Sequence, residues 1–325
     1  MGVDLSIVIV NWNGRDFLPD CLRSIVENPP RCSYEIVVVD NASSDGSVEW
    51  MRSDEARELL GGANFRLIES GGNLGFGRAN NLAFEQTDSR YVFVLNPDSI
   101  VPAGSIDKLI ETLELDEKIG MTAPRLIDEK GELGASVIPF HPTPLSIIVE
   151  EFQLYRLLPK RWIQYWLFGR HWDYDVRRPV PLVAGAAMMC KRAMIDHVGG
   201  FNKDIFMYGE DLEWCVDVYR GGWQIYFEPD AEIIHRCGKS SEQMWSEVEV
   251  MTIQEEAMIK FHRKCFSRIL NFMNSATKVF VMSVHLVRWK ISSRNTAFLR
   301  KLIKMHVRNC RELLTGTNDR TTVSN

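Results

Sequence analysis

In the first hundred residues, short continuous apolar runs alternate with segments in which apolar residues recur at helical spacing. The apolar runs are rich in β-branched residues, which is typical of parallel strands buried on both faces. They lie at residues 5–10, 35–39 and 91–95, and residues 65–68 predict a further short strand. The helical segments lie at residues 17–27, 47–60 and 79–84. This order predicts an α/β fold built from βαβ units around a mostly parallel central sheet.

Each predicted strand is followed by a polar or glycine-rich segment. These segments are residues 11–14, 40–46, 71–81 and 96–98. Because the carboxyl ends of parallel strands meet at one edge of a sheet, we expect the four segments to converge there. The sequence therefore predicts a ligand site at that edge.

The second part of the chain is less regular. Residues 145–175 are rich in aromatic and basic side chains, and we interpret them as an insertion beside the site. A strand is predicted at 179–189, a turn leading into a helix at 199–217, and a last short strand at 231–234. The remainder is predicted to be helical.

Composition and charge narrow the class of protein. The chain has 325 residues, 45% of them hydrophobic, which is enough for a globular enzyme and excludes general disorder. The net charge is -5, yet residues 260–325 are strongly basic and contain only Glu312 and Asp319 as acidic residues. The body is therefore acidic and the tail basic, and we expect no nucleic-acid partner.

The cysteines and the apolar segments predict the cellular location. Seven cysteines form no C-x-x-C pair, which favours reduced thiols in the cytoplasm. No signal peptide is apparent at the N-terminus. The most apolar helical stretch, residues 272–289, contains Lys278, His285 and Arg288 and does not predict a membrane span. We expect a cytoplasmic protein.

Three of the polar segments each allow a functional and a structural interpretation. Residues 40–46 (DNASSDG) can bind a nucleotide base or ribose, or can form a turn and a helix N-cap. Residues 71–81 form a glycine-rich loop that can approach a diphosphate with backbone N–H groups, or a flexible turn. Asp98 in Asn96-Pro97-Asp98 can hold Mg²⁺ or Mn²⁺ against two phosphates, or can belong to a turn.

Two later segments carry titratable side chains. The acidic residues at 210–213 can complement a helix dipole, or one of them can act as a general base. Because Glu210 and Asp211 are adjacent, they point in different directions, so one can be braced while the other faces a cleft. His235 can ligate a metal or serve a structural role, and Lys239 can donate to a phosphate.

Taken together and in this order, the motifs resemble glycosyltransferase family 2, in its rhamnosyltransferase-like branch. The resemblance covers roughly residues 4–265. The matching segments are residues 10–14, 39–47, 73–76, 95–98, 199–201, 207–211 and His235. It implies a GT-A fold and an inverting, metal-dependent hexosyltransferase, with Mg²⁺ or Mn²⁺ as the cofactor.

The resemblance also implies roles for individual residues. Asp40 would bind the nucleotide base, Asp98 would be the main metal ligand, and Asp211 would be the catalytic base. Asn96 stands where the family usually has the first Asp of its metal motif, and Asp217 stands where an Arg is frequent, with Arg220 as a substitute. The implied site comprises catalytic Asp211 and Glu210; donor-binding Asn11, Asp40, Asn73, Gly75, Arg78, Asn96 and Lys239; and metal-binding Asp98 and His235.

The same branch implies the substrates. We expect a nucleoside diphosphate sugar, first dTDP-rhamnose and otherwise another UDP- or dTDP-hexose, and a glycan or polyprenyl-linked sugar as the acceptor. A nicotinamide oxidoreductase would need G-x-G-x-x-G after the first strand, where residues 11–14 supply one glycine. A sugar nucleotidyltransferase would need a glycine-rich, basic loop there, and a non-catalytic binding module would not need Asp98, Asp211 and His235.

The basic tail completes the domain prediction. We expect a catalytic domain at residues 1–265, with a nucleotide-binding half up to about residue 100, and a helical tail at 266–325. Phe298, Leu299, Leu302 and Ile303 share one helix face that can enter an anionic membrane surface, with basic residues around it. This predicts peripheral contact with the cytoplasmic face of the membrane. The alternative is that the tail packs on its own or a neighbouring subunit.

Overall fold

The computed structural model describes residues 2–134, 136–138, 143–157, 174–236, 247–289 and 296–315. The chain forms two compact units: a catalytic unit of residues 1–139 and 168–244, and a helical unit of residues 140–167 and 245–325. The division differs from the domain boundary expected at residue 265. The reason is that helix α11 (Glu247–Cys265) packs on the C-terminal helices.

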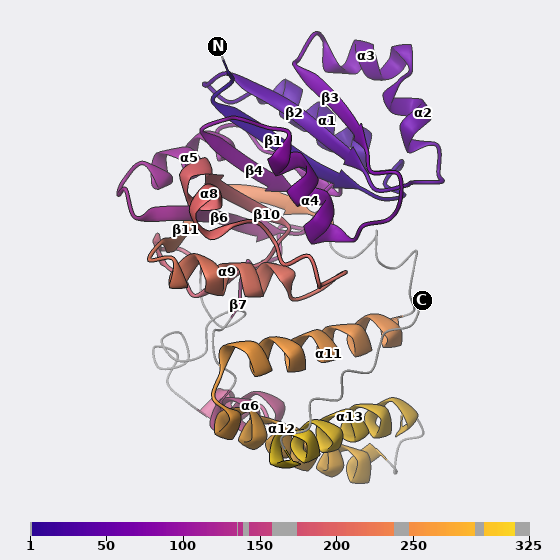
Figure 1. Ribbon diagram of the computed structural model, residues 1–325, viewed down its shortest axis with the longest axis vertical. Helices are drawn as coiled ribbons and strands as arrows, with labels where there is room; N and C mark the ends of the chain where they lie inside the picture. Colours follow the sequence, from indigo (N-terminus) through magenta and orange to yellow (C-terminus); the bar gives the residue numbers. More distant parts are fainter. Residues whose placement is uncertain are drawn as a thin grey trace. The chain divides into compact units, whose positions relative to one another are not determined.

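A mixed sheet with the order β3-β2-β1-β4-β10-β6-β11-β5 forms the centre of the catalytic unit, and β8 pairs with β11 (Figure 1). A separate pair is formed by β7 and β9. The strand bounds are β1 Leu5–Asn11, β2 Tyr34–Asp40, β3 Phe65–Glu69, β4 Tyr91–Leu95, β5 Ser99–Ile100, β6 Ile119–Ile127, β7 Val137–Ile138, β8 Arg178–Pro179, β9 Leu182–Val183, β10 Ala187–Lys191 and β11 Gln224–His235.

The first four long strands are parallel, as the apolar runs predict. β1 pairs in parallel with both β2 and β4, and β2 pairs in parallel with β3. β10 then runs antiparallel between β4 and β6, so the sheet changes direction beside β4. The predicted strand at 179–189 consists of three short strands, and β6 is a strand that the sequence patterns did not reveal.

Helices cover the sheet of the catalytic unit. Their bounds are α1 Leu18–Glu27, α2 Ser47–Met51, α3 Asp54–Leu60, α4 Phe76–Glu85, α5 Ser105–Leu113, α8 Arg192–Val198 and α9 Glu210–Arg220. The single helix predicted at 47–60 is divided, because Ser53 has an extended backbone and its side chain accepts the N–H of Ala56 as a new N-cap.

The continuous apolar runs are explained by burial of both sheet faces. Every residue of β1 is buried. Leu5, Ile7 and Ile9 belong to a core that also contains side chains from α1, α2, α3 and α5. Helix α4 packs against β1 and β2 as well. Because helices cover both faces of the sheet, neither face of a central strand meets water, and polar side chains are found at the end of the strand rather than in alternate positions.

The helical unit contains α6 (Pro144–Glu151), the 3₁₀ helix η1 (Leu154–Leu157), α11, α12 (Arg268–Trp289) and α13 (Thr296–Thr315). Its most extensive helix–helix contacts are between α12 and α13 and between α12 and α6. The expected aromatic insertion at 145–175 is only partly described: α6 and η1 belong to it, and residues 158–173 lie outside the described residues. No helix in the described ranges has the length and hydrophobicity required to cross a bilayer.

Candidate active site

The segments after β1 and β2 meet in a hydrogen-bonded cluster. Asn11 and Asp40 are register partners at the ends of these parallel strands. The Asn11 amide donates to Asp40 Oδ1 at 3.2 Å and to Ser43 Oγ at 3.1 Å, while the Ser43 N–H donates to Asp40 Oδ2 at 3.0 Å. Asp40 is 2% exposed, so its carboxylate is held in one orientation. Asn11 Oδ1 has no partner among the described residues.

The glycine-rich segment is joined to this cluster through Asn41. The Asn41 amide donates to Asn73 Oδ1 at 3.0 Å, and its oxygen accepts the N–H of Leu74 at 2.8 Å. Gly75 begins α4 with φ +81°, and a Cβ there would lie 2.0 Å from the Phe206 carbonyl oxygen. Glycine is therefore required at this position, and the chain passes close to the loop before α9.

Arg78 lies on the first turn of α4 and is exposed. Its Nε donates to the backbone carbonyl of Lys203, a contact within the catalytic unit that the sequence did not predict. Lys239, the other expected phosphate ligand, lies outside the described residues.

The two residues expected at the metal, Asp98 and His235, meet beside Asn96 at the ends of β4 and β11. His235 Nε2 lies 3.2 Å from Asp98 Oδ1 and 3.3 Å from the Asn96 amide nitrogen. Asp98 is 4% exposed. The strand β5, which follows Asp98, pairs antiparallel with the end of β11 and brings Ser99 opposite His235. A carboxylate and an imidazole nitrogen directed at each other match the ligands that Mn²⁺ and other divalent metals accept.

The described residues contain no group of three or more His, Cys, Asp or Glu side chains with metal-binding geometry. Asp98 and His235 are a pair of residue types that could contribute to a divalent-metal site, as expected for them from the sequence.

Asp211 lies on the first turn of α9, which begins after Gly209 at φ +87°. Its Oδ2 accepts the N–H of Gly185 at 2.9 Å, and its Oδ1 accepts the N–H of Leu212 at 2.8 Å. Burial raises the pKa of Asp211, and these two backbone donors oppose the rise. The carboxyl is therefore fixed in position with a higher basicity than an exposed aspartate.

Glu210 is the more buried of the two adjacent acids, at 4% exposure, and its Oε2 has no partner among the described residues. Burial and the nearby charge of Asp211 raise its pKa to about 8. At neutral pH the pair therefore carries mainly one negative charge, which we assign to Asp211.

A single dipeptide joins the metal-site residues to Asp211. The N–H of Gly185 binds Asp211, while the carbonyl of Ala186 accepts the N–H of Asn96 at 2.9 Å. A Cβ on Gly185 would lie 3.3 Å from both Asp211 and Phe76 of α4. Gly185, Asn41 and the loop before β10 were missed by the sequence analysis, although the Gly185-Ala186-Ala187 run offered a signal of close packing.

Comparisons with known proteins identify the family and the fold. Residues 6–178 match the family described as Glycosyl transferase family 2. The chain is 28% identical to a low-salt glycan biosynthesis hexosyltransferase of Haloferax volcanii, over 65% of this chain and 60% of that protein. It is 27% identical to the N-acetylglucosaminyl-diphospho-decaprenol L-rhamnosyltransferase of Mycobacterium tuberculosis, over 73% of this chain and 77% of that protein.

The fold is also similar to that of a solved mannosyltransferase of Pyrobaculum calidifontis in complex with GDP-Man and Mn²⁺. That structure has a TM-score of 0.58 and 15% identity, and the superposition covers 98% of this chain and 89% of the other. The family match extends over more than half of the chain and includes Asn11, Asp40, Gly75 and Asp98. The chain is therefore a member of glycosyl transferase family 2, with a GT-A fold.

Proposed function

We propose that this glycosyltransferase is a metal-dependent, inverting hexosyltransferase that transfers rhamnose from dTDP-rhamnose to a lipid-linked sugar. The observation that carries the proposal is the Gly185-Ala186 dipeptide, which binds Asp211 on one side and Asn96 of the metal cluster on the other. The proposed base and Asn96, which lies beside the proposed metal ligand His235, are thus hydrogen-bonded to two adjacent residues.

Asp98 and His235 would hold the metal, with the Asn96 side chain beside them. When bound, a divalent metal would neutralise the charge that grows on the departing diphosphate. The Asn96 amide lies 3.3 Å from His235, and a rotated amide would direct its oxygen toward the metal.

The transfer would be a single displacement. Asp211 takes the proton of the acceptor hydroxyl while that oxygen forms its bond to the anomeric carbon. The bond from the anomeric carbon to the phosphate oxygen breaks, and the nucleoside diphosphate leaves with the bonding electrons. Attack from the side opposite the leaving group inverts the anomeric configuration. The two backbone N–H groups on Asp211 keep the carboxylate aligned for this proton transfer.

The nucleotide would bind between Asp40 and the loop that begins α4. Asp40 is fixed by Asn11 and Ser43 and can accept hydrogen bonds from a base. The next residue, Asn41, is hydrogen-bonded to Asn73 and so connects Asp40 to the loop that begins α4. The relative from M. tuberculosis is an L-rhamnosyltransferase with a lipid-linked acceptor, which supports rhamnose and a polyprenyl-linked sugar for this chain. The second candidate is another UDP- or dTDP-hexose, supported by the hexosyltransferase of H. volcanii.

A panel of nucleotide sugars tests the proposal. The full chain is incubated with a polyprenyl-diphosphate-linked sugar and each donor, with Mn²⁺, Mg²⁺ or EDTA, and released nucleoside diphosphate and the anomeric configuration of the product are measured. We expect turnover with dTDP-rhamnose and metal, with inversion. Turnover with a UDP-hexose but not with dTDP-rhamnose would identify the second candidate donor. Full activity in EDTA would contradict the metal site.

A further inference from the structure

The exposed apolar surface of the C-terminal helices is not the one that the sequence predicted. The face of α13 that the sequence assigned to a membrane is in fact core: Leu299 and Leu302 are buried against Met282 of α12, with Phe298 and Ile303 packed beside them. These side chains hold the helical unit together and are not free to enter a bilayer.

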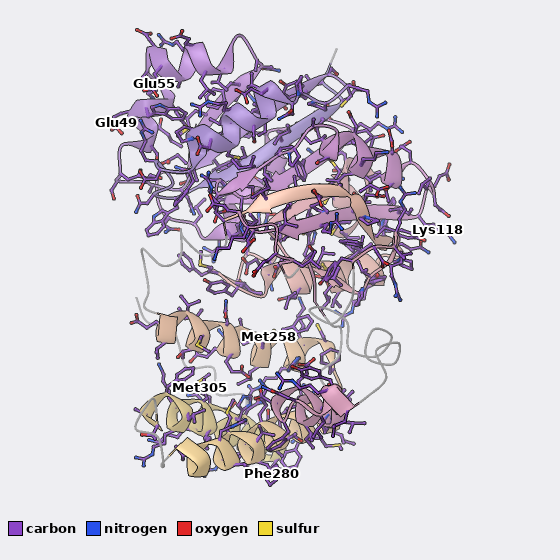
Figure 2. The ribbon with its side chains drawn as sticks, turned by 180° about the vertical axis from the view of Figure 1, so that it is seen from behind. Glu49, Glu55, Lys118, Met258, Phe280 and Met305 are labelled. Carbon is purple, nitrogen blue, oxygen red and sulfur yellow. The ribbon has the colours of Figure 1, made fainter. Side chains whose placement is uncertain are left out.

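A different apolar surface is exposed on α12. Ile269, Met273 and Phe280 are 73%, 47% and 59% exposed, and their spacing places them on one side of the helix. The opposite side carries buried Asn271, Asn274 and Ser275 together with buried Val281 and Met282, so the inner side of α12 is mixed while large apolar side chains also face out. Figure 2 shows Phe280 on the side of the unit away from Met258 of α11.

The outward side of α13 is basic. Its exposed cations are Arg300, Lys301, Lys304, Arg308 and Arg311. Among the described residues, Arg300, Lys301 and Lys304 make no ion pair, and the nearby Glu312 is bound by Arg263 and Arg308. Because α13 packs along α12, the basic side of α13 and the exposed apolar side of α12 belong to the same pair of helices.

We propose that the outer surface of α12 and α13 rests on an anionic lipid surface, with Ile269, Met273 and Phe280 at the acyl boundary and the α13 cations at the headgroups. A lipid interface accepts both kinds of side chain at once. Charge argues against a second copy of this chain as the occupant, because a symmetric contact would bring five cations opposite five. An acidic protein surface would complement the cations and leave the three large apolar side chains in water.

Vesicle sedimentation of the full chain tests the surface, with phosphatidylcholine vesicles with and without phosphatidylglycerol. We expect binding to the anionic vesicles only, weakened by salt. The variant Arg300→Gln/Lys304→Gln/Arg308→Gln should bind about a hundredfold more weakly, since each basic residue near the surface contributes about fivefold. The variant Ile269→Ser/Met273→Ser/Phe280→Ser should lose most of the binding that remains at high salt.

Controls separate this surface from general charge and folding effects. Arg23→Gln/Arg57→Gln/Lys203→Gln removes three exposed cations from the catalytic unit and should leave vesicle binding unchanged. Both test variants should keep the helical content of the parent and its turnover with a detergent-solubilised acceptor. Equal binding by parent and basic variant, or no binding to anionic vesicles at low salt, would overturn the proposal. A dimer in solution that the α12 variant converts to a monomer would overturn it as well, and would assign the surface to a second copy.

Point variants are used because removal of residues beyond Lys264 would strip α12 and α13 from α11. Arg263 of α11 binds Asn309 and Glu312 of α13, and His306 of α13 lies 2.9 Å from Glu255 of α11. A truncated chain would therefore expose the core of the helical unit and create a new adhesive surface.

Discussion

At the scale of single residues, the site depends on side chains whose freedom has been removed. Asp40 is held by Asn11 and Ser43, and Asp211 by two backbone N–H groups. Such bracing costs conformational entropy during folding, and it leaves a group already oriented for its ligand. The adjacent acids Glu210 and Asp211 differ in their surroundings, since burial and the charge of Asp211 raise the pKa of Glu210 to about 8 while backbone N–H groups oppose the rise at Asp211.

The first residue-scale prediction concerns the base. Asp211→Asn keeps the shape of the side chain but removes the proton acceptor, so transfer should fall by about 10²- to 10⁴-fold while binding of the nucleotide sugar is retained. Steady-state turnover and calorimetric titration with the donor measure the two effects. Glu213→Gln is the control, because Glu213 is buried and bound by Asn202 at 2.9 Å. If Glu213→Gln were the more damaging change, the base would be misassigned.

A second residue-scale prediction concerns pH. Folding raises the pKa of Glu210 from 4.5 to about 8, so its contribution favours the folded state most below pH 4.5 and is lost as the pH rises to about 8. In Glu210→Gln the side chain cannot ionise, so the variant lacks this decrease in stability at high pH. We expect the melting temperature of the variant to exceed that of the parent at pH 9 by more than it does at pH 5. A difference that is constant between the two pH values would contradict the raised pKa.

At the scale of elements, strand ends bring together residues that are distant in the sequence. Asp98 follows β4 and His235 ends β11, and the short strand β5 pairs with β11 to set their spacing. The helices of the second unit are fixed in a comparable way by a buried polar network. Glu255 of α11, Lys278 of α12 and His306 of α13 contribute one member from each helix.

The paired strand ends predict a shared metal site. Asp98→Ala and His235→Ala should each weaken Mn²⁺-dependent binding of dTDP by at least tenfold and should lower turnover strongly, because each removes one of two protein ligands. Calorimetry with and without Mn²⁺ separates this effect from loss of the nucleotide pocket. Binding of dTDP in EDTA should be the same in parent and variants. A variant that loses binding equally with and without metal would show damage to the pocket instead.

The polar network predicts acid sensitivity of the helical unit. Burial tends to raise the pKa of Glu255, but the His306 hydrogen bond and the charge of Lys278 outweigh it and lower the pKa to about 2. The carboxylate therefore stabilises the fold above pH 4.5, by roughly 2–3 kcal/mol, and this contribution is lost as the pH falls toward 2. Glu255→Gln should be less stable than the parent at pH 7, and the difference should shrink at pH 3. Urea unfolding followed by circular dichroism measures it.

At the scale of the whole molecule, the candidate site and the proposed lipid-binding surface belong to different units. Every described residue of the candidate site belongs to the catalytic unit, whereas most of the exposed large hydrophobic side chains belong to the helical unit. A ligand of the site should therefore act on the stability of one unit only. Residues 140–167 of the helical unit are inserted between the two segments of the catalytic unit, residues 1–139 and 168–244.

Calorimetric melting tests this division. With dTDP and Mn²⁺ at about a hundred times the dissociation constant, the catalytic unit should gain about 2.7 kcal/mol by mass action and melt at a higher temperature. The transition of the helical unit should not move. The α12 surface variant, with three exposed apolar residues replaced, should give the same ligand-induced shift as the parent. A single transition that moves as a whole would mean that the units unfold together.

The sequence by itself determined the parallel strands of the first hundred residues and the family. Continuous apolar runs at β1, β2 and β4 can be buried only between two layers, and a polar residue at each strand end then has to lie at the sheet edge. For this reason Asn11, Asp40 and Asp98 could be assigned to one edge before any coordinates were known, and the family match agrees with the motif order. The roles given to the individual site residues stay predictions until the variants are measured.

Only the tertiary structure decided which residues from distant segments meet. The Gly185-Ala186 link reaches Asp211, 26 positions further along the chain, and Asn96, 90 positions before Ala186, and no local pattern encodes such a pair of contacts. The same holds for α13, where helical spacing marked an apolar face but could not say whether a membrane or a neighbouring helix would cover it. Burial of Leu299 and Leu302 against α12 answered that question, because apolar side chains leave water for whichever surface the fold brings within reach.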